Sequence, residues 1–304
     1  MSFSSDTKKE ICQYHDKRNG EILAECYGML LFSRQFSEKQ IIFNTENSFV
    51  INRFVQNISE CFGVIVEKKA VLTQRHGGGN IFTATIMLES DCQKIFRHFG
   101  YSGKQINRRI NYAVLEDNIC VSAFLRGVFL ACGSVNNPEK DYHLEFAIPY
   151  KNLCNDLIKV ISTAERLMYT LKIVERKGIY VAYLKDSEQI SDFLAFINAP
   201  VASMQIIETK ILKEIRNNAN RKTNSEVANM KKTITASMKQ QKAIEKIRDT
   251  VGLESLSDEL RQVAVLRLEN PEMSLREIGE RTVPPVSRSG VNHRMQKLLE
   301  IAQE

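Results

Sequence analysis

Residues that could read DNA gather near the C-terminal end of this 304-residue sequence. Residues 287–303 carry the apolar residues Val291, Met295, Leu298 and Leu299 at helical spacing. The opposite face of such a helix would carry polar and basic side chains. These are Arg288, Ser289, Asn292, His293, Arg294, Gln296 and Lys297. Arginine and asparagine hydrogen-bond base edges and lysine suits backbone phosphates, so this face predicts contact with double-stranded DNA.

Two further short helices are expected to position that face. Residues 257–269 have helical apolar spacing and stop at Pro271. Ser274 followed by Glu277 is a capping-box pattern, which predicts that a second helix begins there and runs to about residue 282.

The connection between the second and third helices completes the pattern. The sequence VPPV (283–286) favours a turn, and Ser287 is a suitable N-cap for the third helix. Three helices with a short turn before the last are typical of a helix-turn-helix. We therefore expect an all-α DNA-binding domain over residues 251–304, with Arg288 and Ser289 in the first turn of the recognition helix.

A strongly basic segment precedes this domain. Residues 209–248 hold eleven Lys and Arg and three acids, a net charge of +8, whereas the whole chain has +6. We expect a basic helical linker over 201–250, with a helix at roughly 225–249. One interpretation is a solvated connector. The other is a clamp on DNA phosphates, formed by Arg221, Lys222, Lys231 and Lys232.

The first two-thirds of the chain contain a repeat. Two successive units of about 100 residues each follow the order α-β-α-β-β-α. The first copy is expected to have helices at 21–34, 48–62 and 90–99 and strands at 40–47, 64–74 and 81–88. The second is expected to have helices at 121–133, 151–167 and 187–197, a strand at 142–149 and a hairpin over 168–186 that turns at Gly178.

A glycine lies in the middle of the first helix of each copy. Gly28 and Gly127 are 99 residues apart, and each interrupts an apolar helix. A glycine inside a helix costs roughly 1 kcal/mol relative to alanine, so two at matching places need a reason. Close approach of the two helices across a pseudo-twofold axis provides one.

These two helices and three further segments resemble a known family. YGMLLFSR (27–34) and LRGVFLACG (125–133) look like degenerate LAGLIDADG helices, which pack at the centre of a homing-endonuclease fold. Together with FLRGVFLACGSVNNPEKDYHLEF (124–146), RNNANRKTNSEVAN (216–229) and SRSGVNHRMQKL (287–298), they make the whole chain resemble the WhiA family. The resemblance implies an α+β, two-repeat LAGLIDADG-like domain over 1–200, followed by the helix-turn-helix domain.

The acids that LAGLIDADG nucleases need are missing. Those enzymes hold divalent metal ions through one carboxylate at the end of each central helix. The corresponding positions here are Ser33 and Cys132, and neither provides a carboxylate. Glu38 and Glu139 are near, but they lie beyond the helix ends in turn-like sequence. We therefore expect no catalytic residues and no nuclease activity.

Other enzyme motifs are weak. HGGG (76–79) matches an esterase oxyanion loop, but no G-x-S-x-G nucleophile follows, so a hairpin loop is expected. The five histidines lack metal-ligand spacing, and no P-loop or dinucleotide motif occurs. We expect no enzyme activity, metal, cofactor or small-molecule substrate. The sequence also lacks a signal peptide or an apolar run long enough for a membrane, which predicts a cytoplasmic, nucleoid-associated protein.

We therefore expect a sequence-specific DNA-binding regulator. The resemblance implies a role in bacterial transcription control, cell division, chromosome segregation and, where present, sporulation, with other regulatory proteins as further partners. Two alternatives stay open. The chain could be an active LAGLIDADG endonuclease, which Ser33 and Cys132 disfavour, or a protein-interaction scaffold that the helix-turn-helix anchors to DNA.

Overall fold

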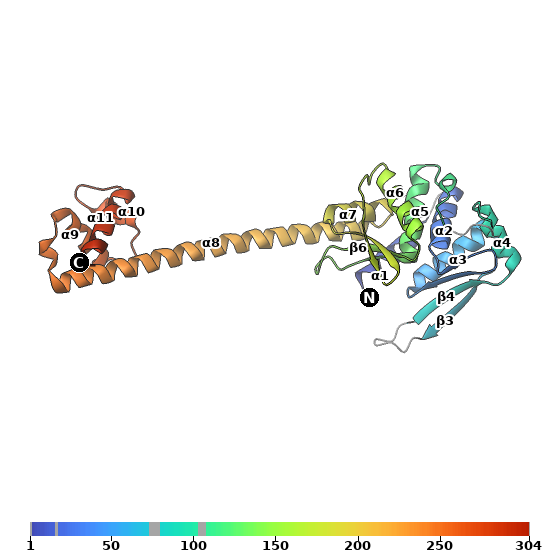
Figure 1. Ribbon diagram of the computed structural model, residues 1–304, viewed down its shortest axis with the longest axis horizontal. Coiled ribbons are helices and arrows are strands. Elements are labelled where there is room, and N and C mark those ends of the chain that lie inside the picture. The colour runs from blue at the N-terminus through green and yellow to red at the C-terminus, as the bar shows by residue number, and fades with distance from the viewer. Residues whose placement is uncertain (1, 16–17, 73–79, 103–107, 304) are drawn as a thin grey trace. The chain divides into compact units, whose positions relative to one another are not determined.

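The computed structural model describes residues 2–15, 18–72, 80–102 and 108–303 (Figure 1). The chain forms two compact units, residues 1–213 and 214–304, each with its own hydrophobic core. The expected boundaries at 200 and 250 are the two ends of one helix, α8 (Pro200–Thr250), which contributes to both units. The division into a domain, a linker and a second domain stays a prediction.

The first repeat of unit 1 closely follows the expected order. It consists of α2 (Asn19–Leu31), β1 (Gln35–Phe36), β2 (Ile41–Thr45), α3 (Ser48–Phe62), β3 (Glu67–Leu72), β4 (Asn80–Ile86) and α4 (Glu89–His98). The strands form an antiparallel sheet in the order β1-β2-β4-β3. Ile41 lies opposite Ile86, and Phe43 lies opposite Ala84. All four side chains are buried, so alternate residues face the core.

The second repeat has the same topology. It consists of α5 (Asn118–Cys132), β5 (Gly133–Val135), β6 (Leu144–Ile148), α6 (Lys151–Thr163), β7 (Lys172–Arg176), β8 (Ile179–Leu184) and α7 (Ser187–Phe196). Its sheet order is β5-β6-β8-β7. The hairpin turns at Gly178, whose φ of 78° is the left-handed conformation that favours glycine. A short 3₁₀ turn, η1 (Tyr112–Val114), precedes this repeat.

The fold contains three elements that the sequence did not predict. α1 (Phe3–Gln13) precedes the first repeat, and β1 and β5 each add an edge strand after a central helix. β1 has two residues and β5 has three, which is too short for an alternating pattern. α1 carries little apolar sequence, but its Ile11 is fully buried, so tertiary packing stabilises this helix.

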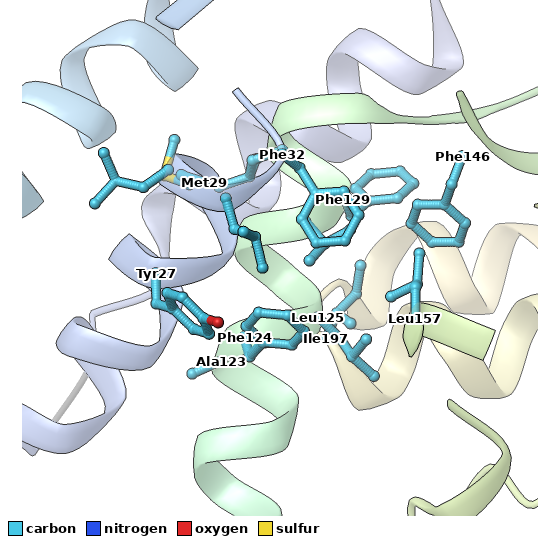
Figure 2. Packing of buried hydrophobic residues seen from close by; sticks show 14 of the residues in the cluster. Tyr27, Met29, Phe32, Ala123, Phe124, Leu125, Phe129, Phe146, Leu157 and Ile197 are labelled. Atoms are coloured by element: carbon cyan, nitrogen blue, oxygen red, sulfur yellow. The ribbon is translucent and has the colours of Figure 1, made fainter. Parts of the chain in front are cut away.

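The central helices α2 and α5 are in backbone contact, as the two glycines predict. A Cβ atom on Gly28 would lie 2.3 Å from the carbonyl oxygen of Phe124. A Cβ on Gly127 would lie 2.1 Å from the carbonyl oxygen of Glu25. Around this crossing the centroids of the aromatic rings of Tyr27 and Phe124 are 5.4 Å apart (Figure 2). The prediction of close packing at both glycines is therefore confirmed.

Unit 2 contains the C-terminal part of α8 and three short helices. They are α9 (Asp258–Glu269), α10 (Leu275–Arg281) and α11 (Arg288–Ile301), with a 3₁₀ turn, η2 (Leu253–Ser255), before them. Ile244 and Ile247 of α8 are buried in the core of unit 2. The helix-turn-helix fold therefore includes part of α8.

α8 is longer than the expected helix at 225–249. No glycine or proline interrupts residues 201–251, and Pro200 has the fixed φ that suits a first helical position. The carboxylate of Glu10 accepts hydrogen bonds from the backbone N–H groups of Val201 and Ala202, at 2.7 and 3.0 Å. A side chain from α1 thus caps the start of α8, and no local pattern at residue 200 could have indicated it.

Candidate nucleic-acid interface

The third helix of unit 2, α11, is held in place by its predicted apolar face. Val291, Met295 and Leu298 are at most 1% exposed, and they pack among residues of α8, α9 and α10. The hydroxyl of Ser287 accepts a hydrogen bond from the backbone N–H of Gly290 at 3.3 Å, so the predicted N-cap is confirmed. Packing and capping together fix which side of α11 faces outward.

The preceding helix is capped as predicted. The Ser274 hydroxyl accepts a hydrogen bond from the Glu277 N–H, and the Glu277 carboxylate accepts one from the Ser274 N–H. This capping box lowers the pKa of Glu277, because its carboxylate accepts that backbone hydrogen bond. It fixes the start of α10, against which α11 packs.

Five of the six predicted DNA-contacting side chains of α11 are exposed. They are Arg288, Ser289, Asn292, His293 and Lys297. Gln296 is exposed beside them. Asparagine and arginine have planar side-chain groups with hydrogen-bond donors. Such groups can make paired hydrogen bonds to base edges in a major groove.

The sixth residue, Arg294, is engaged within the fold. Its guanidinium lies 3.0 Å from the carboxylate of Glu259 on α9, and its side chain is only 18% exposed. The ion pair joins α11 to α9. The geometry therefore favours a positioning role for Arg294 over direct contact with a base.

The four predicted phosphate-binding residues are all exposed on α8, but they do not share one face. At 100° per residue, Arg221 and Lys232 are separated by about 20° around the helix axis. Lys222 and Lys231 are about 180° apart by the same geometry. A duplex on one side of α8 would thus meet Arg221 and Lys232 together, and at most one of the other two.

In unit 1, the ends of the central helices carry cations instead of carboxylates. The Nζ atom of Lys8 donates a hydrogen bond to the Leu130 carbonyl oxygen at 3.2 Å, near the end of α5. Arg108 donates to the carbonyl oxygens of Ser33 and Phe36, at 3.3 and 3.2 Å, beyond the end of α2. Lys8 thus satisfies a carbonyl group in the last turn of α5, and Arg108 satisfies two carbonyl groups of the segment that follows α2.

This arrangement does not fit the divalent ions of a LAGLIDADG nuclease. The Ser33 hydroxyl donates to the carbonyl oxygen of Gln35. Burial raises the pKa of the Cys132 thiol to about 12, so it stays neutral. A hydroxyl, a neutral thiol and two nearby cations oppose the binding of a hard cation. Within the described part of the chain, no three His, Cys, Asp or Glu residues group together as metal ligands.

A buried charge network lies beside the helix crossing, and the sequence did not predict it. Glu25 is fully buried and accepts hydrogen bonds from Arg126 at 2.6 Å, Arg53 at 2.7 Å and Asn57 at 2.9 Å. Arg126 also donates to the Asn198 side chain at 2.6 Å. Burial alone would raise the pKa of Glu25, but Arg126 and Arg53 outweigh it and lower that pKa to about 2. Arg126, the one charged residue of the otherwise apolar helix α5, is the signal that could have indicated this network.

Two further expectations have different outcomes. The HGGG segment (76–79) lies outside the described residues, so its predicted loop cannot be compared with the structure. In the part of the chain that the structure describes, no helix has the length and apolar character that crossing a membrane requires.

Models of two protein domains match this chain. The WhiA LAGLIDADG-like domain matches residues 121–216, and the WhiA C-terminal HTH domain matches residues 219–302. The LAGLIDADG-like match covers the second repeat of unit 1. The HTH match covers most of α8 together with α9, α10 and α11.

Relatives match over the full length. "Probable cell division protein WhiA" of Clostridium botulinum (strain Hall) is 36% identical, with 100% of this chain and 98% of that protein covered. The protein of the same name from Clostridium perfringens (strain SM101) is 35% identical over the same shares. The crystal structure of full-length WhiA from Thermatoga maritima superimposes with a TM-score of 0.61 at 24% identity, covering 100% of this chain and 98% of that one, and so shares its fold. This chain therefore belongs to the WhiA family.

Proposed function

We propose that this protein is a transcription regulator that binds double-stranded DNA through α11 and acts in cell division. The main support for this proposal is the outward face of α11, whose polar side chains are exposed. The apolar face of the same helix is buried in the core of unit 2. The helix-turn-helix family match supports DNA as the partner. The name shared by the relatives, cell division protein, supports the process.

The side chains of α11 divide into base-reading and phosphate-binding groups. Asn292 can make two hydrogen bonds to an adenine, and Arg288 can make two to a guanine. Ser289 and His293 lie on the same outward side and can donate or accept single hydrogen bonds. Lys297, one turn further along, suits a backbone phosphate. Sequence preference would then depend on the first two turns of α11.

The basic residues of α8 add affinity without sequence preference. Arg221 and Lys232 share one side of α8 and would neutralise backbone phosphates next to the site that α11 reads. Lys222 and Lys231 contribute through the same mechanism from the flanks of the helix. Binding to chromosomal DNA would place the protein at the nucleoid, with other regulatory proteins as further partners.

Selection from a random duplex pool tests this function. The full chain should enrich a defined sequence, and the triple variant Ser289→Ala, Asn292→Ala, His293→Ala should lose that enrichment. A matched control replaces three exposed, neutral residues of α8 with alanine: Asn217, Asn218 and Asn220. The control should enrich the same sequence as the wild type. Loss of enrichment in both triples, or in neither, would argue against base reading by α11.

We also propose that unit 1 does not cut DNA. Its helix ends offer Ser33, Cys132 and the cations Lys8 and Arg108 where a nuclease needs carboxylates. The purified chain should therefore bind duplex DNA with Mg²⁺ or Mn²⁺ present and leave both strands intact. Metal-dependent double-strand cleavage that persists through repurification and is lost in a Ser33→Ala, Cys132→Ala variant would overturn this proposal.

A further inference from the structure

Unit 2 contains a cleft of about 500 Å³ that the proposed DNA contacts do not explain. Its walls come from α8, from the end of α9 and from the starts of α10 and α11. Four cations line it, namely Lys232 of α8, Arg267 of α9, Arg276 of α10 and Arg288 of α11. The cleft therefore connects the basic helix α8 to the first residue of the proposed base-reading helix.

Two buried polar atoms on the wall of this cleft have no hydrogen-bond partner. Gln240 is 8% exposed, and its amide oxygen is unpartnered. Arg267 is 2% exposed and donates from Nη1 to the carbonyl oxygens of Pro271 and Met273, at 3.2 and 2.6 Å. Its Nε–H group has no acceptor. Burying a polar group without a partner is unfavourable, so the free Nε–H of Arg267 offers a hydrogen bond to an acceptor in the cleft.

The charges around the cleft select an anion. None of the described residues that line it is Asp or Glu. Arg276 is partly balanced by Glu280 at 3.0 Å, but both of these side chains are exposed, so water screens this pair. Burial lowers the pKa of Arg267, which means that its charge lacks compensation where it lies. An anion in the cleft would supply that compensation.

We propose that this cleft binds a phosphate group. Lys232, Arg276 and Arg288 attract it at the entrance, and the Nε–H of Arg267 donates to one of its oxygens at depth. Thr233 and Ser237 also line the cleft, and their hydroxyl groups donate to the carbonyl oxygens of Asn229 and Pro271.

A backbone phosphate of bound DNA is the source that the geometry favours. Arg288 lines the cleft and is also the first residue of α11, so a duplex in contact with α11 brings its backbone to the entrance. This choice of source rests on the proposed function. Free phosphate would use the same chemistry, and the experiment below separates the two.

A matched pair of variants tests the cleft in the full chain. Thr233→Glu places a carboxylate in the cleft, whereas Thr235→Glu makes the same change about 200° around α8. Both threonines are exposed, so both variants should fold, with circular dichroism as the check. On a random duplex, Thr233→Glu should lower the log–log salt slope by about 0.9, which corresponds to one phosphate contact. Thr235→Glu should leave the slope within error of wild type.

A second pair removes charge instead of adding it. Lys232→Gln should lower the same slope by about 0.9, because this lysine lines the cleft. Lys242 of α8 is exposed, is not among the lining residues and has no proposed contact with DNA, so Lys242→Gln loses the same charge and should leave the slope within error of wild type. Equal slopes for these two variants would contradict a phosphate site in the cleft.

The second arm uses inorganic phosphate as the probe. The melting midpoint of the full chain is compared in phosphate and in chloride at equal ionic strength. A rise in phosphate that Thr233→Glu abolishes and Thr235→Glu preserves would support the cleft with free phosphate as the ligand. A lower log–log salt slope of DNA binding in Thr233→Glu, but not in Thr235→Glu, would support the cleft with the DNA backbone as the ligand.

The proposal fails if Thr233→Glu and Thr235→Glu behave alike in both arms. If the wild-type chain binds no duplex at all, the proposed DNA-binding function fails, and the melting arm alone then decides whether the cleft binds phosphate.

Discussion

The centre of unit 1 and the outer face of α11 use polar residues in opposite ways. At the helix crossing, Glu25, Arg53 and Arg126 are buried, and both arginines donate hydrogen bonds to the Glu25 carboxylate. On α11, Asn292 and His293 are exposed to solvent. The first set stabilises the fold, and the second is available to a ligand.

The difference shows how a LAGLIDADG-like fold can keep its architecture while the residues at its helix ends change. Gly28 and Gly127 still permit the close crossing of α2 and α5. The ends of those helices, in contrast, hold Lys8 and Arg108 against backbone carbonyl groups. Recognition would then depend on unit 2, where Asn292 and His293 of α11 are exposed.

Breaking the buried network should have the largest effect. Glu25→Gln keeps the shape of the side chain but leaves Arg53 and Arg126 without an anion. Removing one partner of a buried pair typically costs about 3–5 kcal/mol, so we expect that loss in the free energy of unfolding of unit 1. Glu188→Gln is the control, because Glu188 pairs with Lys210 at the surface and should cost at most about 1 kcal/mol. Equal losses in denaturant titrations would show that the network does not stabilise unit 1.

The same network makes unit 1 sensitive to acid. The pKa of Glu25 is lowered from its ordinary value of 4.5 to about 2. The unfolded chain therefore binds the proton more readily, and stability is lost as the pH falls from about 4.5 toward 2. The loss attributable to Glu25 should be about 3 kcal/mol, at 1.36 kcal/mol per pKa unit. Urea titrations across this range should show it in the wild type, and a Glu25→Gln variant with the same pH slope would contradict the assignment.

Separating the central helices should have the next largest effect. Gly28→Ala adds a Cβ that would meet the carbonyl oxygen of Phe124 at 2.3 Å, and rigid backbone cannot move aside locally. We expect a loss near the upper end of the roughly 1–3 kcal/mol typical of overpacking. Gly20→Ala in the same helix would meet only Cys120 Sγ at 3.7 Å and should stabilise by about 0.4–1 kcal/mol. Unchanged melting of Gly28→Ala in calorimetry would contradict the close crossing.

Variants of two nearby residues of α11 should distinguish a side chain that reads bases from one that positions the helix. Asn292→Ala should reduce the preference for the selected duplex over a random one by about 1–3 kcal/mol. Arg294→Ala breaks the pair with Glu259 and should lower stability by at most about 1 kcal/mol, weakening both duplexes alike. Binding titrations on both duplexes provide the test, and the reverse pattern would make Arg294 the base-reading residue.

The smallest effects should come from α8. The double variant Arg221→Gln, Lys232→Gln removes two cations from one side of the helix and should lower the log–log salt slope by about 1.8. Lys222→Gln, Lys231→Gln removes the same charge from opposite sides and should lower it by about 0.9 or less. Neither variant should change the preferred sequence. Slopes equal to wild type in both would leave α8 as a solvated connector.

Local patterns predicted much of this structure. Helix α3 covers the expected residues 48–62, and the caps at Ser274 and Ser287 are present. Such features depend on residues a few positions apart. The glycines of α2 and α5 could also be interpreted because the repeat places them at matching positions.

Features that depend on distant residues were not predicted. α1 is stabilised by packing against the rest of unit 1. The start of α8 is capped by Glu10, some 190 residues earlier in the chain. The ion pair of Arg294 with Glu259 likewise joins two helices, so a helical wheel of α11 alone places Arg294 with the DNA-facing residues. In each case tertiary contact, which spacing along the sequence does not reveal, determines the role of the side chain.

The most direct test of the central claim is to sequence the DNA that is crosslinked to this protein in its own cell. The wild-type chain should be crosslinked to sites that share one sequence motif, with the DNA uncut at those sites. The triple variant Ser289→Ala, Asn292→Ala, His293→Ala, expressed at the same level, should be crosslinked without enrichment of that motif. If the triple variant keeps the motif, α11 does not read the sequence, and recognition belongs to unit 1 instead.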